Sequence, residues 1–194
     1  MTAVGGLLLT GGASTRMGTD KSLLVIDGRT WAARAAAVLV AVCGVAVEVG
    51  PGHSDLPAVA ESPPGQGPLP AVVAGRAALA RLGRVGTVVV LACDLPHVTV
   101  DAVQCLASWP GAGSVAPLLD GEPQPLCARW SMAALDAAAR RLAAGGRRVS
   151  GLLDADDAVL IDERWWAPRF GPRAFADVDT VAELEPDRTQ ETDP

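Results

Sequence analysis

The chain has 194 residues, of which 49% are hydrophobic and 20% charged, and its formal net charge at pH 7 is −6. This length favours one domain, and the apolar share excludes a disordered chain. Acidic chains are poor non-specific binders of nucleic acid and anionic membranes, and no apolar run reaches the roughly 18 residues of a membrane span. The start of the chain lacks the basic region of a secretory signal, and its four cysteines have no metal-binding spacing, so we expect a cytoplasmic protein.

The N-terminal half alternates predicted strands with predicted helices. A short apolar run at Ala3–Thr10 indicates a buried strand that ends in a glycine-rich turn. Thr30 is the expected N-cap of a first helix, and Pro70 lies near the start of a second. Val45–Val49 is a predicted strand between them. Thr87–Ala92 is β-branched and unbroken, which is typical of a central strand in a parallel sheet.

The C-terminal half continues the alternation and adds a hairpin. Thr99 and Ser131 are expected to cap two further helices. Segments Ser114–Leu119 and Gln124–Arg129 flank Asp120-Gly121, which is a hairpin turn signal. A short helix, a strand and a last helical turn are expected further along, at residues 149–153, 158–162 and 180–184.

This alternation predicts an α/β fold in one domain. The central sheet is expected to be mostly parallel, with helices on both faces and a β-hairpin insertion. The domain is expected to span residues 1–185, and residues 186–194 are expected to form a flexible tail.

A glycine-rich loop follows the first strand and has the residues of a triphosphate cradle. It reads G-G-A-S-T-R-M-G-T-D-K over residues 11–21. Gly11 and Gly12 allow the backbone N–H groups to face a phosphate, and Arg16 and Lys21 add positive charge. Lys21 is the only lysine in the chain. The spacing matches neither a Walker A loop nor the dinucleotide-binding fingerprint.

Two later motifs carry carboxylates. L-A-C-D-L-P at residues 91–96 places Asp94 at the end of the strongest strand signal, where a carboxylate beside a triphosphate suits Mg²⁺. Cys93 alternates to the other face of this strand and is expected in the core. F-A-D-V-D-T puts Asp177 and Asp179 on one face of an extended segment. These two acids are expected either to ligate a metal or bind a polar substrate, or to form a solvated edge.

With G-P-L at residues 67–69 and Q-P-L-C-A at residues 124–128, these motifs resemble the molybdenum cofactor guanylyltransferase (MobA) family. That family belongs to the nucleotidyltransferases with a Rossmann-like fold, and the five motifs keep family order over residues 7–184. The resemblance implies a fold of that type. It also implies an enzyme that transfers GMP from GTP to the terminal phosphate of molybdopterin carrying molybdenum, releasing pyrophosphate with Mg²⁺.

The resemblance assigns roles to residues by their place in the motifs. Nucleotide binding falls on Leu9, Thr10, Gly11, Gly12, Lys21, Glu61 and Asp94. The metal falls on Asp94. From charge, we expect Arg16 to act with Lys21 and Asp94 in catalysis, and Asp177 to share the metal, because extra negative charge beside two anionic substrates calls for a cation. Acceptor binding falls on Arg147, Arg148, Asp177 and Asp179. The family usually has Ala at Thr10, Asp at Glu61, and Asn at Asp177 and Asp179.

The expected reaction joins two anions, so neutralising and aligning them are the main tasks. A phosphate nucleophile is ionised near pH 7 and needs no general base. The expected partners are GTP, molybdopterin, and proteins that deliver or receive the cofactor. The alternatives are a molybdopterin cytidylyltransferase, a sugar-phosphate nucleotidyltransferase, a non-catalytic nucleotide-binding regulator and a cofactor carrier. The last two are disfavoured because Lys21 and Asp94 are both present.

Overall fold

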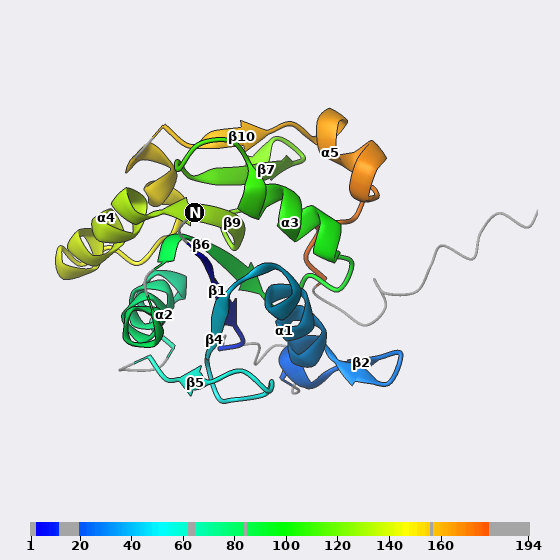
Figure 1. The fold of residues 1–194 in the computed structure, drawn as a ribbon, viewed down its shortest axis with the longest axis horizontal. Coiled ribbons are helices and arrows are strands. Elements are labelled where there is room, and N and C mark those ends of the chain that lie inside the picture. The colour runs from blue at the N-terminus through cyan, green and yellow to red at the C-terminus, as the bar shows by residue number, and fades with distance from the viewer. Residues whose placement is uncertain (1–2, 12–19, 62–64, 84, 156, 179–194) are drawn as a thin grey trace, which may run out of the picture.

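The computed structural model describes residues 3–11, 20–61, 65–83, 85–155 and 157–178 (Figure 1). The strands are β1 (Ala3–Leu9), β2 (Val25–Ile26), β3 (Arg29–Thr30), β4 (Val45–Val49), β5 (Ala58–Val59), β6 (Val85–Ala92), β7 (Val115–Leu119), β8 (Glu122–Pro123), β9 (Cys127–Ser131) and β10 (Val159–Ile161). The helices are α1 (Trp31–Val42), α2 (Pro68–Leu82), α3 (Val100–Ser108), α4 (Met132–Ala143) and α5 (Glu163–Phe170), with 3-10 turns η2 (Lys21–Leu23) and η3 (Ser150–Ala155).

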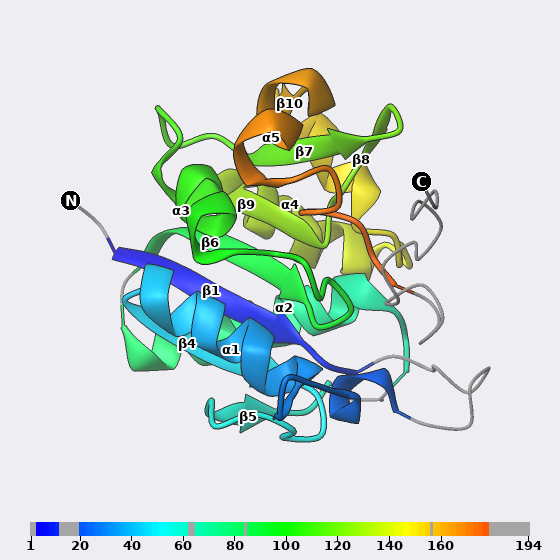
Figure 2. The ribbon, with the colours of Figure 1, turned by 90° about the vertical axis from the view of Figure 1, so that its right-hand side faces the viewer.

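One mostly parallel sheet forms the centre of the part that the structure describes. Its strand order is β10-β7-β9-β6-β1-β4-β5, with β8 paired to β7. Strand β1 is parallel to both β4 and β6, whereas β9 runs antiparallel to β6. The predicted α/β fold with a mostly parallel sheet is therefore confirmed. The carboxyl ends of β1, β4 and β6 point to the same edge, which Figure 2 shows for β1 and β6.

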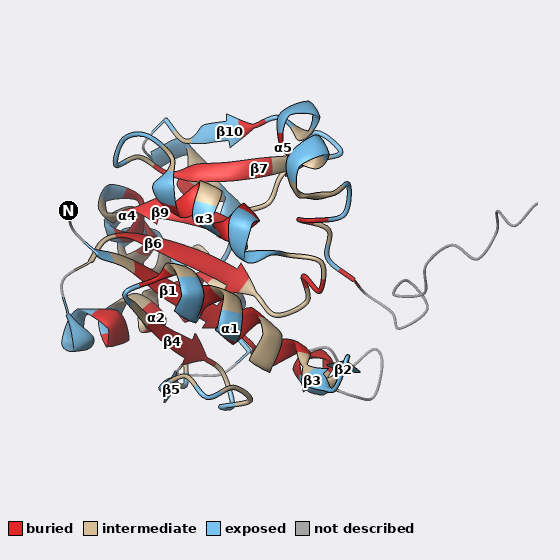
Figure 3. Cartoon of the chain, turned by 45° about the vertical axis from the view of Figure 1, so that its right-hand side comes forward, coloured by how far each residue is buried: buried red, intermediate tan, exposed pale blue. Residues whose placement is uncertain are grey.

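Helices cover both faces of the sheet, as the alternation predicts. Helices α2 and α4 lie on one face, and α1 and α3 lie on the other (Figure 1). Each face has its own apolar core, one around Leu7, Val72 and Trp130 and the other around Leu8, Leu39 and Trp166. Successive β1 residues enter opposite cores because side chains alternate along a strand. Figure 3 shows β4, β6 and β7 as largely buried, whereas most of the edge strand β10 is exposed.

Three predicted N-caps are confirmed. Thr30, Thr99 and Ser131 precede α1, α3 and α4, and each side-chain hydroxyl accepts a hydrogen bond from the backbone N–H three residues on. The N···O distances are 3.1, 3.2 and 3.0 Å. Such a cap satisfies one of the N–H groups that a helix start leaves without a partner, and it stabilises by about 1 kcal/mol.

The hairpin forms at the predicted turn, but its second strand is not the one predicted. Strand β7 pairs with the two-residue β8 around Asp120-Gly121. The segment expected to pair there, Gln124–Arg129, instead supplies most of β9, which pairs chiefly with β6. The β7–β8 ladder ends at Pro123, and Pro125, which has no N–H to donate, lies between this ladder and β9.

The hairpin of β2 and β3, the turn η2 and helix α5 were not predicted from the sequence. A small hairpin joins β2 to β3 around Asp27 and Gly28, whose φ angles are 50° and 76°. Helix α5 follows Asp162, whose side chain accepts from the backbone N–H of Arg164, and it contains Pro168. Among the described residues, no helix is long and apolar enough to cross a membrane. The expected turn at 180–184 and the tail lie outside the described residues.

Candidate active site

A cleft of about 350 Å³ opens at the edge of the sheet where β1 and β6 end. Its lining comes from five separate stretches of the chain: the end of β1, the start of η2, the loop before α2 with the first turn of that helix, the end of β6, and Leu126 before β9. The predicted nucleotide-binding residues that line it are Leu9, Thr10, Gly11, Lys21, Glu61 and Asp94. Open α/β sheets bind ligands outside the carboxyl ends of their strands, which is where these residues meet.

Lys21 lies at the start of η2 with its side chain almost buried in the cleft wall, at 9% exposure. Its Nζ donates to the backbone O of Val178 at 3.2 Å. The backbone N–H of Val178 in turn donates to the O of Asp94 at 3.0 Å. The C-terminal segment therefore bridges the backbone of the Asp94 loop and the lysine, which are 73 positions apart in the numbering.

The backbone N–H groups at the end of β1 are already used within the sheet. The N–H groups of Thr10 and Gly11 both donate to the O of Val49, at 3.2 and 3.4 Å. In this structure the N–H of Gly11 is directed to Val49, and its expected contact with a phosphate stays a prediction. Both residues line the cleft.

Glu61 holds the loop before α2 and keeps one oxygen for the cleft. Its Oε1 accepts from the backbone N–H of Gly65 at 2.6 Å. Its Oε2 is buried and has no hydrogen-bond partner among the described residues. A buried acceptor without a donor is costly, so this oxygen is suited to accept a hydrogen bond from a ligand N–H. Gly67, with φ 96°, turns the chain from this loop into α2.

Cys93 lines the cleft as well as packing against the core beside α1, so the prediction that it is a core residue is only half right. Burial, with the nearby carboxylates of Asp94 and Asp20, raises the pKa of its thiol to about 12. A thiol with this pKa stays protonated at neutral pH and is a poor nucleophile.

The other predicted site residues are not in the cleft lining. Arg147 and Arg148 are exposed, although the backbone O of Arg147 lies 3.8 Å from the position that a Cβ on Gly67 would take. Asp177 is also exposed, next to the bridging residue Val178. Three further predicted residues lie outside the described residues: Gly12, Arg16 and Asp179.

Comparison with known proteins identifies the family. Residues 6–159 match the model of the MobA-like NTP transferase domain. The chain belongs to the MobA-like NTP transferase family. A relative named probable molybdenum cofactor guanylyltransferase, from Chloroflexus aggregans, is 36% identical over 156 residues, which cover 74% of this chain and 73% of that protein.

Solved structures show the same fold as this family member. The molybdopterin-guanine dinucleotide biosynthesis protein A of Archaeoglobus fulgidus superposes with a TM-score of 0.70 at 20% identity, covering 93% of this chain and 94% of that one. A Mycobacterium tuberculosis protein solved in complex with manganese gives a TM-score of 0.58 at 15% identity, covering 83% and 88%. Both confirm the nucleotidyltransferase fold expected from the motifs.

The carboxylates of this MobA-like site suit a metal that arrives with a nucleotide. No group of three or more acidic, His or Cys side chains that would hold an ion exists among the described residues. Asp94 and Asp20 both line the cleft. Mg²⁺ in phosphate-transfer sites takes one or two carboxylates together with phosphate oxygens and water. The donor set therefore fits Mg²⁺ bound with a triphosphate.

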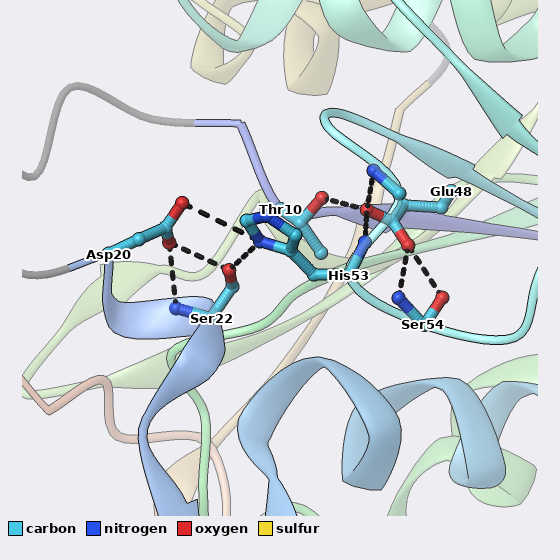
Figure 4. Close-up of polar contacts among 7 residues, drawn as sticks. Thr10, Asp20, Ser22, Glu48, His53 and Ser54 are labelled. Atoms are coloured by element: carbon cyan, nitrogen blue, oxygen red, sulfur yellow. Dashed lines mark hydrogen bonds and ion pairs between the residues drawn. The ribbon is translucent and has the colours of Figure 1, made fainter.

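One buried acid beside the cleft was missed. Glu48 lies in β4 with 0% exposure. Its Oε1 accepts from the hydroxyl of Thr10 at 2.5 Å and from the N–H groups of Gly52 and His53, both at 2.8 Å. Its Oε2 accepts from the N–H and the hydroxyl of Ser54, at 2.8 and 2.6 Å (Figure 4). A single acid within the valine-rich V-A-V-E-V strand was the available signal.

Glu48 is ionised at neutral pH. Burial by itself raises the pKa of this carboxyl, but the hydrogen bonds from Ser54, Thr10 and His53 outweigh it and leave the pKa below its usual value. A lowered pKa means that the folded state favours the charged form. Its contribution to stability is therefore present above the usual pKa and is lost as the pH falls through the lowered one.

Proposed function

We propose that this protein transfers GMP from GTP to the terminal phosphate of molybdopterin, releasing pyrophosphate. One observation carries the proposal: the cleft gathers Lys21, Asp94 and Glu61 from three distant motifs at the end of β1. These side chains supply a cation for the phosphates, a metal ligand and an acceptor for the base. The names of the relative and of the Archaeoglobus protein support molybdopterin as the acceptor.

In the proposed reaction, an oxygen of the acceptor phosphate attacks the α-phosphorus of GTP. One P–O bond forms there, and the bond to the β-phosphate bridging oxygen breaks, so pyrophosphate leaves with the electron pair. Lys21 offsets the negative charge that develops on the leaving group. Because its Nζ is also held by the backbone of Val178, the ammonium is placed before the nucleotide arrives.

We further propose Mg²⁺ as the metal, held by Asp94 and the triphosphate. When bound, it would neutralise phosphate charge and fix the line of attack. The manganese complex of the Mycobacterium tuberculosis protein supports a divalent cation in this fold. Arg16 is proposed to add positive charge to the phosphate loop.

Base selectivity tests the guanylyl assignment. Guanine presents N1–H and an N2 amine, two donors suited to the carboxylate of Glu61, and cytosine lacks this donor pair. We expect GTP to be used well ahead of CTP. Glu61→Gln is expected to reduce that preference by about 10-fold or more, because its amide places N–H groups against the donors of guanine. The measurement is pyrophosphate release with each nucleotide, Mg²⁺ and molybdopterin.

Glu122→Gln, an equivalent change in the exposed β8 hairpin, is the matched control and is expected to keep the wild-type preference. Equal use of both nucleotides by the wild type, or a preference for CTP, would move the protein to the cytidylyl branch. A thermal-shift series with GTP, CTP, ATP and UTP measures nucleotide binding separately, since a ligand of the native state raises its stability.

We propose that Asp177 and Asp179 lie toward the acceptor, and that Asp177 also helps to hold Mg²⁺. Asp177 precedes Val178, whose backbone contacts both Lys21 and Asp94. Asp177→Asn is then expected to raise the Mg²⁺ concentration for half-maximal rate several-fold, with GTP affinity at saturating Mg²⁺ unchanged. Initial rates over a Mg²⁺ titration measure this. Coincident curves for the wild type, Asp177→Asn and Asp179→Asn would exclude both acids from the metal.

Arg147 and Arg148 are proposed to hold anionic groups of the acceptor, since their segment lies beside Gly67 at the cleft.

We propose that residues 1–185 act as one domain, supported by the single central sheet. A cytoplasmic location is supported by the four cysteines, all of them unpaired. Proteins that deliver or receive the cofactor complete the proposed partners.

A further inference from the structure

Glu48 joins the end of β1 to the loop that follows β4. The hydroxyl of Thr10 reaches it from β1, and Gly52, His53 and Ser54 reach it from the loop. All five donors converge on one carboxylate that has no access to solvent. Thr10 lines the cleft and Glu48 does not, so the carboxylate contacts the cleft wall through Thr10, on the side away from the cleft.

Close packing supports the same junction. A Cβ on Gly50 would lie 2.1 Å from the hydroxyl oxygen of Thr10, so only glycine lets the β4 chain pass this close. The N–H groups of Thr10 and Gly11 donate to Val49, which follows Glu48 directly. Side-chain and backbone contacts therefore both tie the end of β1 to the end of β4.

The loop held by Glu48 reaches the phosphate-binding lysine through His53. The His53 Nδ1 lies 2.6 Å from the Ser22 hydroxyl and 3.6 Å from Oδ2 of Asp20 (Figure 4). Ser22 in turn contacts Oδ1 of Asp20 through its N–H at 3.0 Å and its hydroxyl at 2.7 Å. Asp20 and Ser22 flank Lys21 in the sequence, so this cluster brackets the lysine on both sides.

The proton positions in this cluster follow from its chemistry. The Ser22 hydroxyl has a single proton, and it donates that proton to Oδ1 of Asp20. The Ser22 oxygen then accepts from His53, which requires a proton on Nδ1. The ring of His53 is thereby held against η2 while its backbone N–H is held by Glu48.

We propose that Glu48 is a positioning residue, which sets the end of β1 through Thr10 and the Lys21 turn through His53 so that both walls of the cleft are placed before a nucleotide binds. The identity of the ligand, GTP, rests on the proposed function, whereas the positioning of the cleft walls by Glu48 does not. It predicts that breaking the network behind the cleft weakens GTP binding, although neither Glu48 nor Ser54 lines the cleft.

Glu48→Gln is the direct test. The amide group adds N–H donors to a site built from five donors, so the junction is expected to loosen. We expect GTP affinity, measured by calorimetry, to fall by about 10-fold or more, the scale of a hydrogen-bonded charge. In rate measurements, KM for GTP is expected to rise by a larger factor than kcat falls. The reason is that the displaced cleft walls weaken nucleotide binding, whereas the groups that contact the reacting phosphates are unchanged.

Two milder variants keep the test valid if Glu48→Gln folds poorly. Ser54→Ala removes one hydroxyl donor to Glu48, and His53→Ala removes the link to η2 but keeps the backbone N–H that Glu48 binds. Both are expected to fold and to bind GTP more weakly than the wild type. Ser131→Ala is the matched control, because it also removes one hydroxyl that accepts or donates within the fold, here the N-cap of α4. Ser131 is paired with Thr87 in β6, at the opposite end of that strand from Asp94.

Amide hydrogen exchange without any ligand separates this proposal from the proposed function. Peptides that cover Thr10–Gly11 and Lys21–Ser22 are expected to exchange faster in Glu48→Gln and Ser54→Ala than in Ser131→Ala. If exchange at the cleft matches the control in both variants, Glu48 is only a stability element and the proposal is overturned. Failure of the wild type to bind GTP would instead overturn the proposed function and leave the exchange result standing.

Discussion

Lys21→Ala is expected to lower the rate of guanylyl transfer by at least about 100-fold, the scale of one well-placed electrostatic contact. The single lysine of the chain lines the cleft, almost buried, with its ammonium held by the backbone of Val178. Alanine removes both the charge and this tether. The measurement is pyrophosphate release at saturating GTP, Mg²⁺ and acceptor.

Arg81→Ala is the matched control for the Lys21 variant. It removes one positive charge from the exposed last turn of α2, so its effect reports on net charge alone. We expect this variant to keep wild-type turnover. Thermal unfolding of both variants shows whether the loss of rate comes from loss of structure. An unchanged turnover in folded Lys21→Ala would remove the lysine from the mechanism.

Asp94→Asn is expected to lose Mg²⁺-dependent activity by about 100-fold or more while keeping part of its affinity for GTP. Asp94 follows β6 and lines the cleft, and its backbone O accepts from Val178. The neutral amide keeps this backbone contact but is a weak ligand for Mg²⁺. The side chain of Lys21 and the Glu61 loop still meet the nucleotide.

A Mg²⁺ titration of the initial rate, with GTP affinity measured in parallel, tests the Asp94 variant. Asp154→Asn, in the exposed part of η3, is the matched control and is expected to give the wild-type curve. Wild-type activity of Asp94→Asn at low Mg²⁺ would show that another carboxylate is the principal ligand. Asp20, which also lines the cleft, would then be the next residue to test.

Local patterns were sufficient where one segment decides its own structure. The β-branched run at Thr87–Ala92 became the core of β6, and the caps at Thr30, Thr99 and Ser131 formed as predicted. These features depend on side-chain alternation or on a hydroxyl three residues from an N–H, which the sequence displays directly. The order of the motifs was enough to predict the family, which the family match confirms.

Short or irregular elements could not be predicted in the same way. Strands β2 and β3 have two residues each, too few to show alternation, and Pro168 obscures the pattern of α5. The pairing of β9 with β6 depends on where the chain leaves the β7–β8 hairpin near its prolines. Which strands become neighbours is set by packing across the whole sheet, which no single segment displays. The hairpin turn was predicted, whereas its partner strand was not.

The motifs and their order were enough to predict the family, the fold class and the main residues that line the cleft: Leu9, Thr10, Gly11, Lys21, Glu61 and Asp94. The tertiary structure alone decided that Val178 bridges Lys21 and Asp94, and that Glu48 is held by donors from two segments. The physical reason is that a buried charge needs hydrogen-bond donors, and one donor to Glu48, the Thr10 hydroxyl, comes from 38 positions away in the chain. The sequence around Glu48 does not indicate that the Thr10 hydroxyl is one of its donors.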